Sequence, residues 1–82
     1  MSPVNTVLSL AGVRLTPREQ SLVELVVEGY GNTQIAKRLW LAQSTVKNEL
    51  HKLYERLGIG NRVELTRLYF LQREKSNAHR KQ

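Results

Sequence analysis

The chain has 82 residues, which suffice for one small domain and leave no room for a second domain with its own core. It contains no cysteine, which excludes disulfides, thiolate metal sites and cysteine nucleophiles. Its two histidines, His51 and His79, lack any metal-ligand spacing, so we expect neither a metal nor another cofactor. Thirteen Lys and Arg residues against seven Glu residues give a net charge of +6, which is typical of a protein that binds a polyanion.

Residues 1–14 are expected to form an N-terminal extension or linker. The uncharged part of this segment is too short to span a bilayer and is interrupted by Pro3, Asn5 and Gly12. It also lacks the basic leading region of a signal peptide, so we expect a cytoplasmic, nucleoid-associated protein with no membrane partner. Thr6–Leu10 is the only run compatible with a β-strand, and it is too short for us to expect a sheet.

The first expected helix covers about residues 17–28. Thr16 can cap it, Pro17 suits the first helical position, and Glu19 stands where a capping box returns a bond to the cap amide. Gly29 follows, where helices commonly end in a left-handed residue. We expect the glutamates on the surface of this helix, Glu19 among them, to stay solvated.

A second, shorter helix is expected from about Asn32 to Trp40. Its apolar stripe consists of Ile35, Ala36 and Leu39. We interpret Trp40 as a residue that packs in the core or at its rim. Only Leu41, Ala42 and Gln43 separate this helix from the next periodic run, a length that suits two helices crossing steeply.

The third expected helix runs from about Ser44 to Leu57 and has two distinct faces. Its apolar stripe recurs at helical spacing and consists of Val46, Leu50, Leu53 and Leu57. The opposite side carries Ser44, Lys47, Asn48, His51 and Glu55. The pattern therefore predicts a helix with one core face and one polar, largely basic face.

A fourth helix is expected to begin at the cap residue Asn61, with Glu64 three positions on, and to end near Arg73. Residues 74–82 are interpreted as a basic, frayed C-terminal tail. The core stripe of this helix would consist of Leu65, Leu68 and Tyr69, whereas Val63, Phe70 and Leu71 fall off its centre. The predicted fold class is all-α, a four-helix domain over residues 15–73.

The second and third helices, with their short connection, fit a helix-turn-helix, which places the start of its second helix against base edges in the major groove. Lys47 can donate to guanine, Asn48 can bond adenine, and His51 lies one turn further along the same face. Gln43 and Ser44 lie at the start of the third helix, where it would enter the groove. The residues thus predict a reader of double-stranded DNA.

An ordered set of motifs extends this interpretation. It consists of Leu15-Thr16-Pro17-Arg18-Glu19, Gly29, Asn32, Ile35-Ala36, Leu39, Thr45-Val46-Lys47, Leu57-Gly58 and Asn61-Arg62-Val63-Glu64-Leu65. In order and spacing this set resembles the LuxR/FixJ-type, GerE-like DNA-binding domain, over about residues 15–71. The resemblance implies a bacterial transcription regulator that binds promoter DNA as a homodimer through its fourth helix, and it assigns base reading to Lys47, Asn48 and His51.

The resemblance also suggests residues that contact backbone phosphates. These are Thr33, Thr45, Lys52 and Arg62. The chain departs from the family pattern at three positions. The family usually has serine or threonine in place of Gly31, serine in place of Ala42 and histidine in place of Glu49. Ala42 cannot cap the third helix with its side chain, and Glu49 either pairs with Lys52 or repels the DNA.

Two functions from different classes remain open at this point. The first is a sequence-specific regulator of transcription, with RNA polymerase as a further partner. The second is a helix-turn-helix module that binds another regulator or the polymerase without reading DNA, which the departures at Ala42 and Glu49 favour. We do not expect an enzyme, because the sequence has no paired carboxylates in a plausible cleft, no nucleophile with a base and no phosphate loop.

Overall fold

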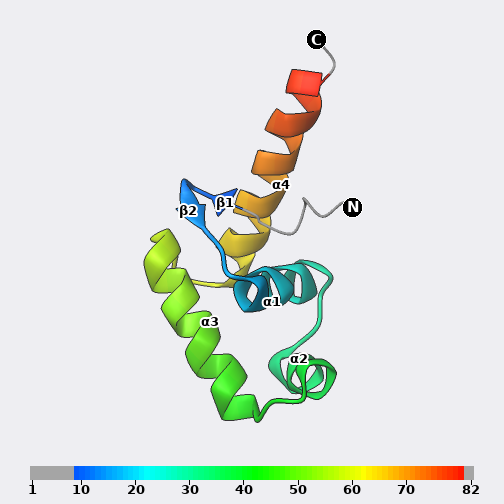
Figure 1. The fold of residues 1–82 in the computed structure, drawn as a ribbon, viewed down its shortest axis with the longest axis vertical. Coiled ribbons are helices and arrows are strands. Elements are labelled where there is room, and N and C mark those ends of the chain that lie inside the picture. The colour runs from blue at the N-terminus through cyan, green and yellow to red at the C-terminus, as the bar shows by residue number, and fades with distance from the viewer. Residues whose placement is uncertain (1–8, 81–82) are drawn as a thin grey trace.

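The computed structural model describes the backbone of residues 9–80 and the side chains of residues 9–73. A short hairpin of β1 (Ser9–Leu10) and β2 (Val13–Arg14) comes before the helices (Figure 1). The helices are α1 (Pro17–Val27), α2 (Asn32–Leu39), α3 (Gln43–Leu57) and α4 (Arg62–Arg80). The expected all-α, four-helix fold is confirmed, with this hairpin as an addition to it.

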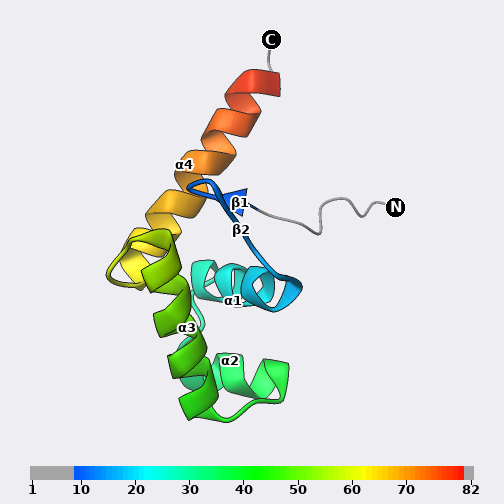
Figure 2. The ribbon, with the colours of Figure 1, turned by 60° about the vertical axis from the view of Figure 1, so that its left-hand side comes forward.

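The first three helices lie together at one end of the molecule, and α4 extends away from them (Figures 1 and 2). Helix α2 packs against α3, whereas α1 packs against α2, α3 and α4. Only residues 40–42 connect α2 to α3. This arrangement leaves one long side of α3 without a neighbouring helix (Figure 2).

Local signals at the helix ends act as the sequence predicts. The amide of Glu19 donates to the Thr16 hydroxyl at 3.0 Å, and the Glu19 carboxylate accepts from the Thr16 amide at 2.9 Å, which completes the capping box of α1. At α4 the Asn61 side chain accepts from the Glu64 amide at 3.0 Å, while the Glu64 carboxylate accepts from the amide of Gly60 at 3.0 Å. The caps therefore fix where both helices begin.

Helix α4 is longer than expected. It continues to Arg80 instead of ending near Arg73, so the frayed-tail interpretation of residues 74–80 is wrong for the backbone. Residues 74–80 contain neither glycine nor proline, so nothing in them stops a helix once it has started. Residues 81 and 82 lie outside the described part of the chain.

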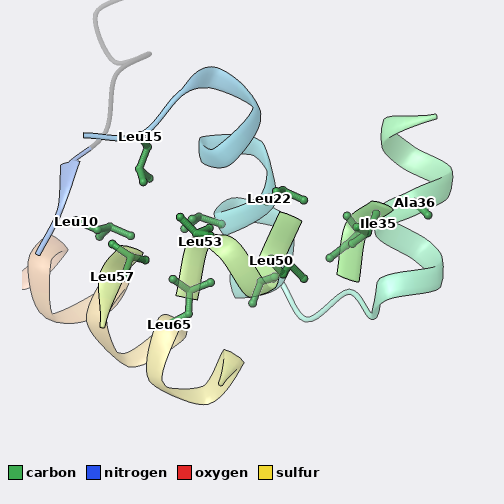
Figure 3. Close-up of a cluster of buried hydrophobic side chains, with 12 residues drawn as sticks. Leu10, Leu15, Leu22, Ile35, Ala36, Leu50, Leu53, Leu57 and Leu65 are labelled. Carbon is green, nitrogen blue, oxygen red and sulfur yellow. The ribbon is translucent and has the colours of Figure 1, made fainter. Parts of the chain in front are cut away.

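The core is a single cluster of aliphatic side chains (Figure 3). The whole predicted stripe of α3 is buried, with exposed fractions between 0% and 8% for Val46, Leu50, Leu53 and Leu57. Helix α1 contributes Leu22, Val23 and Val26, helix α2 contributes Ile35 and Ala36, and α4 contributes Leu65. The amphipathic interpretation of α3 is thus confirmed.

The hairpin corrects our expectation that the chain forms no strand. Leu10 pairs with Val13 in an antiparallel register, and the turn residues Ala11 and Gly12 have φ values of +51° and +77°. The Leu10 side chain is fully buried in the core, so the segment expected to be an extension or linker contains a residue of the core. A hairpin this short is marginal alone, and its burial against the helices is what stabilises it.

Two long side chains attach this hairpin to the helices. Gln72 of α4 donates to the Ser9 carbonyl, and Arg56 of α3 donates to the Arg14 carbonyl at 2.9 Å. Arg56 also forms an ion pair with Glu19, whose side chain is only 18% exposed. The expectation that Glu19 stays solvated is therefore wrong, because a partner distant in sequence covers it.

The position of Trp40 also differs from the expectation. Helix α2 ends at Leu39, and Trp40 caps it in the left-handed conformation, with φ +60° and ψ +43°. The Trp40 side chain is 92% exposed, so it packs neither in the core nor at its rim. Leu39 and Leu41, on either side of it, pack against the core instead.

We predict that Leu50→Ala lowers the free energy of unfolding by about 2–5 kcal/mol, because Leu50 is 4% exposed and its truncation leaves a cavity. Thermal denaturation followed by circular dichroism measures the loss. Leu71→Ala is the matched control, since Leu71 is 50% exposed and surface substitutions usually change stability by less than about 0.5 kcal/mol. An unchanged melting temperature for Leu50→Ala would mean that α3 is rotated differently about its axis.

We also predict a pH-dependent effect of Glu19→Gln. Partial burial by itself raises the pKa of the Glu19 carboxyl group, but the hydrogen bonds from Arg56 and Thr16 and the charge of Arg56 together lower it below its ordinary value of 4.5. Because the folded state lowers this pKa, ionised Glu19 stabilises the fold fully above about pH 4.5, and the contribution disappears as the pH falls through the folded-state pKa.

The stability difference between wild type and Glu19→Gln should therefore be largest at neutral pH and vanish in acid. Melting temperatures measured from neutral pH down to about pH 3 test this. Arg56→Gln should remove only part of this pH-dependent difference, because the hydrogen bonds from Thr16 to Glu19 remain, and it should remove no more of it when Glu19→Gln is already present. A difference that stays constant across this range would contradict the ion pair.

Candidate nucleic-acid interface

Helix α3 presents a continuous polar face to solvent. The burial of Val46, Leu50 and Leu53 fixes the rotation of the helix about its axis. The side chains of Lys47, Asn48 and His51, expected on the opposite side, are all exposed. This face is available for binding because no described helix covers it.

The start of α3 is open as well. Its cap residue is Ala42, which forms no side-chain cap, as the sequence departure implied. The first turn consists of Gln43, Ser44 and Thr45, one residue earlier than predicted, and the side chains of Gln43 and Ser44 are exposed. Amide groups that no side chain caps, together with the helix dipole, favour an anion near this end.

A hollow of about 610 Å³ lies between the polar face of α3 and the start of α4. It brings together four of the predicted site residues, namely Lys47, Asn48, His51 and Arg62. The other predicted residues, Gln43, Ser44, Thr33, Thr45 and Lys52, do not line it. Of these five side chains Thr45 is half-buried and the other four are exposed.

Three polar residues in this hollow were missed as site residues. Asn32, Tyr54 and Asn61 line it, and Asn61 had been assigned only a capping role. A signal for Tyr54 exists in the sequence, because Lys47, His51 and Tyr54 follow the helical spacing i, i+4, i+7. Asn32 and Asn61 gave no such signal, since they reach the hollow from other elements.

The charges on this face are unevenly paired. Among residues 9–73, no carboxylate lies within ion-pair distance of Lys47. His51 lies 3.3 Å from Glu55, and both side chains are largely exposed, so solvent weakens this pair. Lys47 therefore offers a free positive charge where the helix meets solvent.

Glu49 takes a different partner from the one considered. Both of its carboxylate oxygens accept from Arg18 of α1 at 3.1 Å, so the alternative of a pair with Lys52 is wrong. Arg18 reaches Glu49 because α1 packs beside α3. The positive charge of Arg18 thus compensates the negative charge of Glu49. This pairing weakens the repulsion between Glu49 and DNA that the sequence suggested as an alternative.

Arg62 connects the hollow to the segment between α1 and α2. Its guanidinium group donates to the backbone carbonyl of Tyr30, at the connection between α1 and α2. Beside it, partial burial raises the pKa of the Tyr54 hydroxyl above its ordinary value, and the positive charge of Arg62 partly opposes this. Tyr54 therefore stays neutral and can donate a hydrogen bond from within the hollow.

The outer side of α4 carries three exposed apolar side chains, with the exposed Arg67 on the same side of the helix. Val63, Phe70 and Leu71 are 73%, 49% and 50% exposed, whereas Leu65 of the same helix is buried. The Phe70 ring contacts the Tyr69 ring edge-on, with centroids 5.5 Å apart. These three side chains form what we call the α4 apolar patch.

Neither metal binding nor membrane spanning has support in the residues that the structure describes. They contain no group of three or more His, Cys, Asp or Glu side chains able to hold a metal ion. None of the described helices is long and apolar enough to cross a bilayer.

Several known regulators of transcription are similar to the chain. A protein of Mycobacterium bovis named as an HTH-type transcriptional regulator is 47% identical over 51 residues, which are 62% of this chain and 6% of that protein. A protein of Aeromonas salmonicida, also named as an HTH-type transcriptional regulator, is 41% identical over 61 residues, which are 74% of this chain and 31% of that protein. The HTH-type transcriptional regulator MalT of Yersinia pestis is 42% identical over 50 residues, 61% of this chain and 6% of MalT.

The chain spans less than a third of the length of these curated relatives. No solved structure gives a significant match. The family model for bacterial regulatory proteins of the luxR family matches residues 13–69, which include the second strand, the first three helices and the first part of α4. The chain therefore belongs to the luxR family of bacterial regulatory proteins, and the matched segment is a helix-turn-helix, DNA-binding domain of transcription regulators and not an enzymatic domain.

Proposed function

We propose that the chain reads the major groove of promoter DNA with α3 and acts as a sequence-specific regulator of transcription. The observation that carries this proposal is the outward polar face of α3, with Lys47 exposed and without a carboxylate partner in the described residues. A helix with side chains is about as wide as the major groove, so this face can approach base edges.

The residues of this face would have different roles in DNA binding. Lys47 would donate to guanine O6 and N7, and Asn48 would bond an adenine. His51, one turn later, would reach a third base, while Gln43 and Ser44 would contact bases near the start of the helix. Each good base contact is worth about 1–3 kcal/mol of discrimination.

Contacts with the phosphates would fix the position of α3 in the groove. We assign them to Thr33, Thr45, Lys52 and Arg62. Arg62 has N–H groups beyond the one that it gives to Tyr30, since a guanidinium carries five donors. It can therefore hold the fold and a phosphate together.

The α4 apolar patch would form a homodimer. A two-fold contact through Val63, Phe70 and Leu71 would bury side chains that a small monomer seldom leaves exposed together. Such a dimer would set two α3 helices one turn of DNA apart, about 34 Å. One helix pair buries little area, so the dimer would form mainly on DNA.

Within a longer regulator, the chain would supply the part that binds DNA. We place it in the cytoplasm, associated with the nucleoid, with RNA polymerase as a further partner. The rival interpretation, a module that binds proteins only, has lost part of its support because Arg18 compensates the charge of Glu49.

Selection of bound duplexes from a random-sequence pool, followed by titration at two salt concentrations, tests the proposed function. A DNA reader enriches a defined motif, and its affinity falls steeply with salt because phosphate contacts release counterions. Absence of enrichment together with salt-independent or undetectable binding would favour the protein-binding module.

We predict that Lys47→Ala weakens binding to the selected site about tenfold or more, with a much smaller loss on random duplex, because a base contact is removed. Fluorescence anisotropy on both duplexes measures this. Lys52→Ala is the matched control and should weaken both duplexes alike, as loss of a phosphate contact does. Equal losses for Lys47→Ala on both duplexes would assign Lys47 to the backbone.

We predict that Phe70→Glu removes cooperative binding to a duplex with two half-sites and leaves binding to a single half-site unchanged. The introduced carboxylate would be buried against its symmetry mate, which is unfavourable for a like-charge pair. Stoichiometry and cooperativity from titrations on both duplexes provide the measurement. If the variant binds the double site as cooperatively as the wild type, α4 is not the dimer surface.

A further inference from the structure

Trp40 is an unusual residue for the place it occupies. It is the single tryptophan of the chain, and its side chain is 92% exposed in the turn between α2 and α3. In the described residues, its indole ring forms no hydrogen bond and no ring contact. An exposed large aromatic side chain gives up the burial that usually stabilises it.

The backbone conformation of Trp40 adds a further energetic cost to placing a tryptophan here. With φ at +60°, the residue adopts the left-handed conformation, which suits glycine and is uncommon for a bulky side chain. Strain of this kind persists where the surrounding structure enforces it, and it is concentrated at functional sites. The fold gains no packing from the indole, so its use is expected outside the monomer.

The position of Trp40 suggests a contact with the sugar-phosphate backbone at the edge of the major groove. Two residues, Leu41 and Ala42, lie between it and Gln43, the first residue of α3, so the Cα atoms of Trp40 and Gln43 are at most about 11 Å apart. This is less than the groove width of about 12 Å. When Gln43 and Ser44 face base edges, Trp40 is therefore within reach of the sugar-phosphate backbone that borders the groove.

The charges around Trp40 favour a polyanion as its partner. Residues 29–48 contain Lys37, Arg38 and Lys47 and no acidic residue. Arg38 is folded onto the Tyr30 ring, 4.2 Å from its centre, while Lys37 is exposed in the last turn of α2. Within the turn of residues 40–42, Trp40 also has the only side-chain hydrogen-bond donor, its Nε1–H.

We propose that Trp40 packs its indole ring on a deoxyribose of the DNA backbone and donates from Nε1 to a neighbouring phosphate oxygen. This contact rests on the proposed insertion of α3 into the groove. It anchors the turn without reading sequence, and it supplies a side-chain contact at the start of α3, where Ala42 supplies none.

Because Trp40 is the single tryptophan, its fluorescence reports on this contact directly. The full chain is titrated with a mixed-sequence duplex of about two helical turns, and quenching of tryptophan emission by acrylamide is measured with and without DNA. Acrylamide is uncharged, so the DNA does not repel it. We expect saturating DNA to reduce the quenching constant at least twofold.

Substitutions separate this contact from a role in folding. Trp40→Gly should keep or raise the melting temperature, because glycine suits φ +60° and the indole is 92% exposed. It should weaken binding of selected and random duplexes alike, by about tenfold, which is typical of losing a hydrogen bond to a charged group. Trp40→Phe keeps an aromatic ring but has no side-chain donor, so its DNA affinity should lie between those of the wild type and Trp40→Gly.

The salt dependence gives a matched control. The indole is uncharged, so Trp40→Gly should leave the slope of affinity against salt unchanged, whereas Lys52→Ala should reduce it by about one. If anisotropy shows DNA binding while acrylamide still reaches Trp40 fully, or if Trp40→Gly binds like the wild type, the contact is wrong and the exposed indole belongs to a protein partner. If the chain binds no duplex at all, the proposed function fails, and this contact fails with it.

Discussion

The burial of the α3 stripe is the constraint on which the rest of the structure depends. Val46, Leu50 and Leu53 can all be buried only if α3 has one particular rotation about its axis. That rotation turns Lys47 and His51 outward, because residues on opposite sides of a helix cannot share a face. The hydrophobic effect in the core thus determines which polar groups of α3 face a ligand, although none of these groups contributes to the core.

Contacts between distant residues hold this arrangement at its edges. Arg56 joins α3 to Glu19 of α1 and to the carbonyl of Arg14 in the hairpin, while Arg18 of α1 holds Glu49 of α3. Surface ion pairs of this kind each stabilise a fold by about 1 kcal/mol or less, so they tune the position of α3 more than they drive folding. Arg62 acts similarly from α4 through the carbonyl of Tyr30.

The predictability of each feature follows from how local its cause is. The capping box at Thr16, the stripe of α3 and the cap at Asn61 depend on residues a few positions apart, so the sequence alone predicted them. The hairpin could not be predicted in this way, because its stability comes from burying Leu10 against helices far along the chain. The partners of Glu19 and Glu49 escaped prediction for the same reason, since both lie on other elements.

The residues of the candidate site also differ in whether a local pattern or the tertiary arrangement places them. The polar face of α3 followed from helical spacing, whereas Asn32 and Asn61 join its hollow only through the tertiary arrangement. The side chains of Lys47, Asn48 and His51 are exposed and have at most one weak partner, so exchanging them should cost little stability. Under the proposed function, the core can therefore stay fixed while the recognised DNA sequence changes, provided that the stripe of α3 keeps its rotation.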